Sequence, residues 1–80
     1  QPIDDQWLND EKPVMTRDGR PVEVISVDIK SVPNIVIGQI VDGDKVMNFK
    51  WEDDGTCISA EDRLGNPTKP TKDDDLVKGI

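Results

Sequence analysis

The apolar positions of the chain fall into short runs with strand periodicity, separated by turns. Three runs are rich in β-branched and aromatic residues, namely "PVEVISVDI" (21–29), "IVIGQIV" (35–41) and "KVMNFKW" (45–51). Two shorter runs, "PVMT" (13–16) and "TCIS" (56–59), have the same character. The pattern therefore predicts five strands.

Asp-Gly pairs separate several of these runs, at 18–19, 42–43 and 54–55. Asp-Gly between two apolar runs is a strong hairpin signal, because both central residues of a type I′ turn need a positive φ. The first pair lies in "TRDGR" (16–20), and the second is predicted to supply the central residues of a type I′ turn.

Two of the predicted strands depart from simple alternation. Val22 and Val24 share one face, whereas Ile25 and Val27 share the other, which predicts a β-bulge at Val24–Ile25. The run 35–41 is almost wholly apolar, and this predicts a central strand buried on much of both faces.

Both ends of the chain are less regular. Residues 1–12 are polar and acidic, with apolar residues at loose helical spacing, and form either an arm docked through Trp7 or a loose tail. "SAEDRLGN" (59–66) resembles one capped helical turn that ends at Gly65, within an irregular insert or linker over 60–72. Residues 76–77 form either a last strand or a frayed end. The domain division is an arm (1–12) and one small β domain (13–80).

A sheet of this size limits its exposed edges by curling. We therefore expect a mainly β fold, a small five-stranded antiparallel SH3-like roll or partly open barrel, with the N-terminal arm and at most one helical turn. An open antiparallel sheet capped by the arm is the alternative.

The charge balance bears on the kind of partner. Acidic residues number 17 and basic residues 10, so the formal net charge is −7. This charge disfavours direct binding to nucleic acid and favours a protein partner with a basic surface, although it also serves solubility alone. The acidic candidates for such a face are Asp42, Asp44, Glu52, Asp53 and Asp54. If they cluster on one face, they could mimic the charge of nucleic acid and make the protein an inhibitor.

The residue types needed for most catalysis are absent or unsupported. The sequence has no histidine and one cysteine, so a Ser-His-Asp triad and an intrachain disulfide are both excluded. Spacing around Asp42 does not fit a calcium loop, and the run 73–75 is expected to be solvated. Asp53 and Asp54 are expected to raise the pKa of Cys57. We expect no enzymatic activity, no metal and no cofactor.

The sequence bears on cellular location only through two features that it lacks. It has no apolar run long enough for a membrane span and no signal-peptide pattern, so a cytoplasmic location is expected. Because the sequence begins with Gln1 rather than Met, we expect residues to have been removed before it.

Three stretches resemble a group of small phage- and prophage-type proteins: "MTRDGRPVEVISVD", "NIVIGQIVDGDKVMNFKWEDDGTCIS" and "DDDLV". The resemblance covers roughly 13–58 and 73–77. It implies a small β-roll and a phage or bacterial origin. It implies no catalytic residues, because the group has no agreed function.

Four further residues are candidates for partner binding. Trp51 and Trp7 serve either as exposed anchors or as packing residues. Arg17 and Arg20 flank the first turn, where they grip a partner's anion or pair with nearby acids such as Glu23. The favoured function is a protein-interaction module that docks through the acidic face or a strand edge. The alternative is a structural subunit that forms homo-oligomers through its arm and C-terminal tail.

Overall fold

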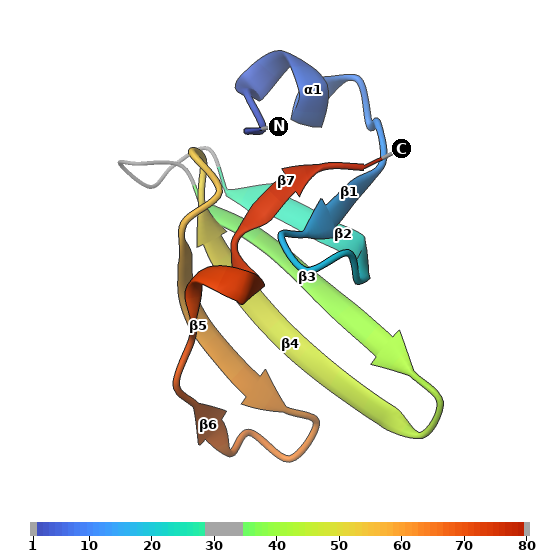
Figure 1. Cartoon of the computed structure of the whole chain (residues 1–80), viewed down its shortest axis with the longest axis vertical. Coiled ribbons are helices and arrows are strands. Elements are labelled where there is room, and N and C mark those ends of the chain that lie inside the picture. The colour runs from blue at the N-terminus through green and yellow to red at the C-terminus, as the bar shows by residue number, and fades with distance from the viewer. Residues whose placement is uncertain (1, 29–34, 80) are drawn as a thin grey trace.

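The computed structural model describes residues 2–28 and 35–79, and within them all strands belong to one antiparallel sheet. The elements are α1 (Asp5–Asn9), β1 (Val14–Thr16), β2 (Pro21–Asp28), β3 (Ile35–Asp42), β4 (Lys45–Glu52), β5 (Cys57–Asp62), β6 (Pro67–Thr68), the 3₁₀ turn η1 (Lys72–Asp74) and β7 (Leu76–Lys78). The strand order is β6-β5-β4-β3-β2-β1-β7, and the sheet curls into a half-barrel with α1 above it (Figure 1).

The mainly β class is confirmed, but the prediction of five strands is wrong, because the described residues contain seven. The two additional strands are short and gain their stability from partners rather than from their own apolar pattern. β6 pairs with β5, and β7 pairs with β1 across some sixty residues of sequence. The strand count and order do not confirm an SH3-like roll.

The predicted β-bulge in the second strand is confirmed. Val24 pairs with Gly38 and Ser26 pairs with Ile37, so Ile25 is the additional residue between the two pairs. The bulge changes which side chains face inward, and it bends β2 relative to β3.

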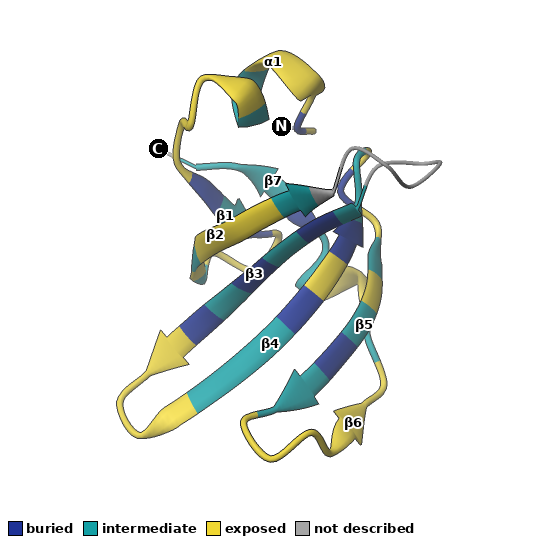
Figure 2. Ribbon diagram, turned by 180° about the vertical axis from the view of Figure 1, so that it is seen from behind, coloured by how far each residue is buried: buried dark blue, intermediate teal, exposed yellow. Residues whose placement is uncertain are grey.

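Burial on β3 is one-sided, so the prediction of a strand buried on much of both faces is wrong. Val36, Gly38 and Ile40 are buried, whereas Val41 is 57% exposed and Ile37 is half-buried. Figure 2 shows this alternation along β3. The reason is that the described residues form a single curled layer, whose concave side is filled and whose convex side faces solvent.

Three of the turns share one construction, a three-residue loop that ends in a glycine with positive φ. The glycine N–H groups donate as follows: Gly19 to Thr16 O (2.8 Å), Gly55 to Glu52 O (2.9 Å) and Gly65 to Asp62 O (3.0 Å). Their φ angles are +93°, +96° and +86°, as in a type I turn followed by a G1 bulge. The predicted helical turn at 59–66 is therefore wrong, because β5 continues to Asp62 and a hairpin turn follows it.

The turn between β3 and β4 has a different construction. Asp42 pairs with Lys45, so the two-residue loop is Gly43-Asp44 and lies one residue later than predicted. Gly43 occupies the first central position with φ +60°, where type II′ turns place glycine. The predicted type I′ turn is wrong, since Asp44 does not have a positive φ.

The stretch 60–72 is not a linker. Ala60 and Glu61 belong to β5 and pair with Thr68 and Pro67 of β6. The Asp62 carboxylate accepts hydrogen bonds from the backbone N–H groups of Leu64 and Asn66, both 2.9 Å, and these bonds fix the turn.

The core lies on the concave side of the sheet and centres on Trp51. This residue is fully buried, its ring stacks on Phe49 with centroids 5.3 Å apart, and its indole N–H donates to Asp74 O (2.6 Å). The other buried apolar residues are Ile3, Val14, Val36, Ile40, Ala60 and Leu76.

The arm is docked rather than loose. Ile3 is 5% exposed, and the Trp7 indole N–H donates to Pro13 O (2.7 Å). Pro2 also bridges to Val77 of β7. No helix in the described residues has the length and apolar character needed to cross a membrane.

Candidate functional site

The predicted acidic face is divided between two places. Asp42 and Asp44 lie at the turn between β3 and β4, whereas Glu52, Asp53 and Asp54 lie at the opposite end of β4. β4 has eight residues, so its ends are roughly 23 Å apart at about 3.3 Å per residue. The clustering that a nucleic-acid mimic needs is therefore not provided by these five residues.

The two tryptophans both serve packing. Trp51 has no exposed surface, so it cannot contact a partner without unfolding of the core. Trp7 is half-buried against the core, and the ammonium groups of Lys12 and Lys78 each lie 4.9 Å from its ring centroid. Trp7 thus holds the arm onto β7.

Arg20 is held in an internal ion-pair cluster. Its Nε lies 2.8 Å from Asp18 Oδ1, and its Nη2 lies 2.6 Å from Asp74 Oδ1. The Asp18 carboxylate also accepts a bond from the Thr16 hydroxyl. Glu23, the partner expected from the sequence, instead accepts a bond from the Gln39 amide (3.2 Å). Arg20 therefore joins the first hairpin to the C-terminal segment.

Arg17 has an exposed side chain, and among the described residues it makes no ion pair. Its backbone N–H donates to Asp75 O (2.8 Å), and the N–H of Asp18 donates to Asp73 O (3.4 Å). The run 73–75 is thus structural and not simply solvated. Asp75 contributes further, because its carboxylate accepts the Cys57 N–H (3.0 Å).

Several carboxylates are stabilised in their charged form. Hydrogen bonds from the Arg20 guanidinium and then the Thr16 hydroxyl lower the pKa of Asp18 below its ordinary value of 3.8. Backbone N–H donors, from Trp7 to Asp4, from Thr56 to Asp54 and from Asn66 to Asp62, lower the pKa of these three acids.

This pattern predicts that the stability of the fold depends on pH in the acidic range. A carboxyl whose pKa is lower in the folded state stabilises the fold above its unfolded pKa, and the stabilisation is lost as pH falls through the folded pKa. We expect the urea midpoint to be constant from neutral pH down to about pH 5 and to fall below about pH 4. Asp18→Asn should flatten this fall, as measured by circular dichroism across the acid range.

Cys57 is predicted to react slowly with alkylating agents. Burial is the main cause that raises the pKa of its thiol from 9.0 to about 11, and the charges of Asp74 and Asp75 add to it. Asp53 and Asp54, which the sequence pointed to, are not among these causes. The rate of iodoacetamide labelling at neutral pH should lie well below that of the urea-unfolded chain, because the thiolate is the reactive form.

One opening on the molecule results from a mismatch in strand length. β1 has three residues and β2 has eight, and on β2 only Pro21 and Val22 pair with β1. Beyond Val22, β2 has no strand partner on its β1 side within the described residues. The edge of β2 is therefore free over most of its length.

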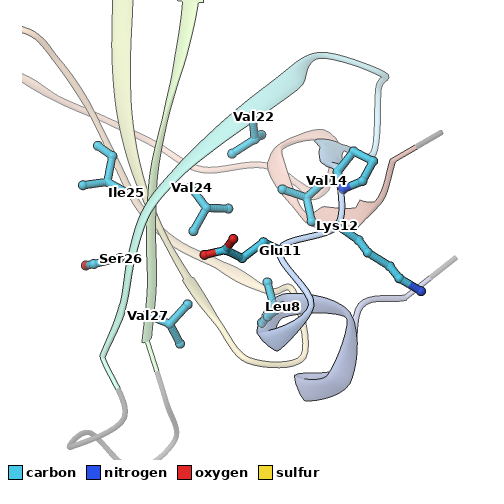
Figure 3. A pocket seen from close by; sticks show the side chains of 10 residues that line it. Leu8, Glu11, Lys12, Val14, Val22, Val24, Ile25, Ser26 and Val27 are labelled. Carbon is cyan, nitrogen blue, oxygen red and sulfur yellow. The ribbon is translucent and has the colours of Figure 1, made fainter.

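A groove runs along this free edge and separates it from the arm. It has a volume of about 360 Å³ and is lined by residues 8, 11–14, 22 and 24–27 (Figure 3). We call it the β2 groove. Its lining combines polar groups with apolar side chains, of which Leu8 lies on one side and Val22, Val24 and Val27 lie on the other. The Val24 side chain points toward the arm and is 37% exposed, so apolar surface is open to a ligand (Figure 3).

Backbone groups also face the β2 groove. Thr16 N–H donates to Arg20 O (2.9 Å), which makes these two residues a hydrogen-bonded pair of the β1–β2 hairpin. Hydrogen-bonded pairs recur at every second residue of an antiparallel ladder, so Val22 forms the next such pair with Val14. The N–H and C=O groups of Val24, two residues further along β2, therefore point to the same side of the strand as those of Val22. No β1 residue lies opposite Val24 to receive them.

The sequence indicates an exposed strand edge in general but not this one. The signal was available, because the predicted run at 13–16 is much shorter than the run at 21–29 with which it forms a hairpin. Such a mismatch leaves one strand uncovered.

Within residues 2–28 and 35–79, no three metal-binding side chains come together. Comparison with protein-family models, with curated proteins and with solved structures gives no match to this chain. The kinship with phage-type proteins stays a prediction.

Proposed function

We propose that this protein is a non-enzymatic protein-interaction module, which binds an extended segment of a partner protein along the free edge of β2. The segment would add as a strand beside β2, and its side chains would enter the β2 groove. In this mode of recognition, main-chain hydrogen bonds supply affinity and pockets for alternate side chains supply specificity.

The observation that supports the proposal best is the coincidence of an unpaired strand edge with a groove that exposes apolar side chains. Neither feature alone would indicate a binding site, since short strand edges and scattered exposed apolar residues occur on most proteins. Here Val24 contributes to both, because its peptide groups lie on the free edge and its side chain lines the groove.

The assembly alternative receives less support. The arm and the C-terminal strand, through which copies would associate, are both engaged within one chain. Met15 pairs with Val77, and the Lys78 ammonium lies 3.6 Å from an Asp4 carboxylate oxygen. Light scattering at micromolar concentration should therefore give the mass of a monomer.

Selection from a displayed library of short random peptides tests the proposal. We expect selected peptides to bind the wild-type protein and to lose at least about tenfold in affinity on Val24→Asp, because a charge would replace an apolar side chain that points into the groove (Figure 3). Val41→Asp is the matched control, since it is the same substitution at an exposed position of the same sheet but outside the β2 groove. It should change the affinity by less than about twofold.

An equal loss on both variants would contradict a site at the β2 groove. Selected peptides that bind both variants as tightly as the wild type would contradict it as well. Circular dichroism of both variants checks that each remains folded.

A further inference from the structure

The β2 groove contains one charged group directed into it. Glu11 and Lys12 both line the groove, but their side chains point in different directions (Figure 3). The Glu11 carboxylate lies between Leu8 and Val24, whereas the Lys12 side chain leads away from the groove and its ammonium lies over the Trp7 ring. The groove therefore presents a negative charge beside apolar side chains.

Glu11 occupies a position where glycine is usual. Helix α1 ends at Asn9 with Asp10 as its C-cap, and two hydrogen bonds close it: Glu11 N–H to Leu8 O (3.1 Å) and Lys12 N–H to Trp7 O (3.3 Å). This is a Schellman motif with Glu11 as its left-handed residue, at φ +55°. Among the described residues it is the only one other than glycine with a positive φ.

A side chain in this conformation is strained, and glycine would relieve the strain. A strained residue at the rim of a groove is a reason to look for a role of its side chain. Glu11 makes no ion pair with any described residue, so its carboxylate is available to a ligand.

We infer that the segment bound in the β2 groove carries a lysine or arginine next to apolar residues, and that this cation pairs with Glu11. The inference rests on the proposed function. The net charge of −7 supports it, because it attracts a basic segment over a longer range than the ion pair alone.

A second copy of the chain fits this site less well. Two copies that pair through their β2 edges about a twofold axis would bring both Glu11 carboxylates to the same interface. Each copy also carries a net charge of −7, so the two would repel one another. A basic, apolar, extended segment of another protein has the complementary chemistry.

The experiment uses the random peptide library on the wild-type protein and on Glu11→Lys. Peptides selected on the wild type should be enriched in Lys and Arg, and those selected on Glu11→Lys should be enriched in Asp and Glu. Glu11→Gln should weaken the wild-type peptides by roughly three- to tenfold, more at low salt than at high salt. Asp10→Asn is the control, because it removes the same charge from a neighbouring residue outside the groove and should leave the affinity unchanged.

Glu11→Gly separates recognition from a purely structural role. It should raise the urea midpoint, since glycine relieves the positive φ, and at the same time it should lose the preference for basic peptides. A variant that is more stable and retains the preference would overturn the inference.

The other outcomes separate the inference from the proposed function. Peptides that depend on Val24 but show no basic enrichment and no response to Glu11→Gln would overturn the inference and leave the proposed function standing. The absence of any peptide that depends on Val24 would overturn both. A wild-type dimer that Val24→Asp abolishes would identify a second copy as the occupant and would also overturn the inference.

Discussion

Trp51→Ala is expected to remove a large part of the protein's stability. The indole is fully buried, stacks on Phe49 and donates a hydrogen bond to Asp74 O (2.6 Å). Truncation of a buried tryptophan typically removes about 3–5 kcal/mol, and an 80-residue domain has only about 4–12 kcal/mol of stability in total. Urea unfolding followed by circular dichroism measures the change.

Trp7→Ala is the matched control, with the same change of side chain on the arm. Trp7 is half-buried and donates a single hydrogen bond, to Pro13 O. Its loss should destabilise by about 1–2 kcal/mol, less than half the effect at Trp51. Equal effects of the two substitutions would mean that the core does not centre on Trp51.

The second large effect is expected at Gly55. Its φ is +96°, and a Cβ atom there would overlap the carbonyl oxygen of Leu76. The backbone of the same two residues is joined, because Leu76 N–H donates to Gly55 O (2.7 Å). Gly55→Ala should therefore destabilise by at least about 3 kcal/mol, since it combines left-handed strain with a clash against the backbone.

Gly65→Ala separates these two causes. Gly65 occupies the same turn position with φ +86°, but a Cβ atom there meets nothing within 4 Å. Its substitution should destabilise by about 1 kcal/mol, from backbone strain alone. If both glycine variants unfold at the same urea concentration, the close contact between Gly55 and Leu76 is not present in solution.

The local features of the fold could be predicted from the sequence. Runs rich in β-branched and aromatic residues marked the long strands, and the change of phase at Val24–Ile25 placed the bulge correctly. The glycines at 19 and 55 located two turns because glycine adopts the positive φ of these turns without steric cost. These signals lie within a few residues of the feature that they predict.

The remaining features depend on contacts between distant segments. The spacing of Ser59, Asp62 and Gly65 fits a capped helical turn as well as a hairpin, and only the pairing of β6 with β5 decides between them. Likewise, Asp74 resembles a solvated residue until the fold places Arg20 and the Trp51 indole beside it. The one-sided burial of β3 also depends on the absence of a second layer in the described residues.

The candidate site was the least predictable part. The acids at 42–44 and 52–54 are close in sequence but lie at opposite ends of β4. No local sequence pattern pointed to Glu11. Two features distinguish it, its positive φ at the end of α1 and its place beside the edge of β2, and both depend on the fold.

Amide hydrogen exchange at β2 tests the central claim most directly, that a partner segment adds as a strand along this edge. The account predicts that the Val24 N–H exchanges rapidly in the free protein and at least about tenfold more slowly when a selected peptide is bound. Val22, which already pairs with Val14, should change far less. Tight binding of the peptide with unchanged exchange at Val24 would contradict the account.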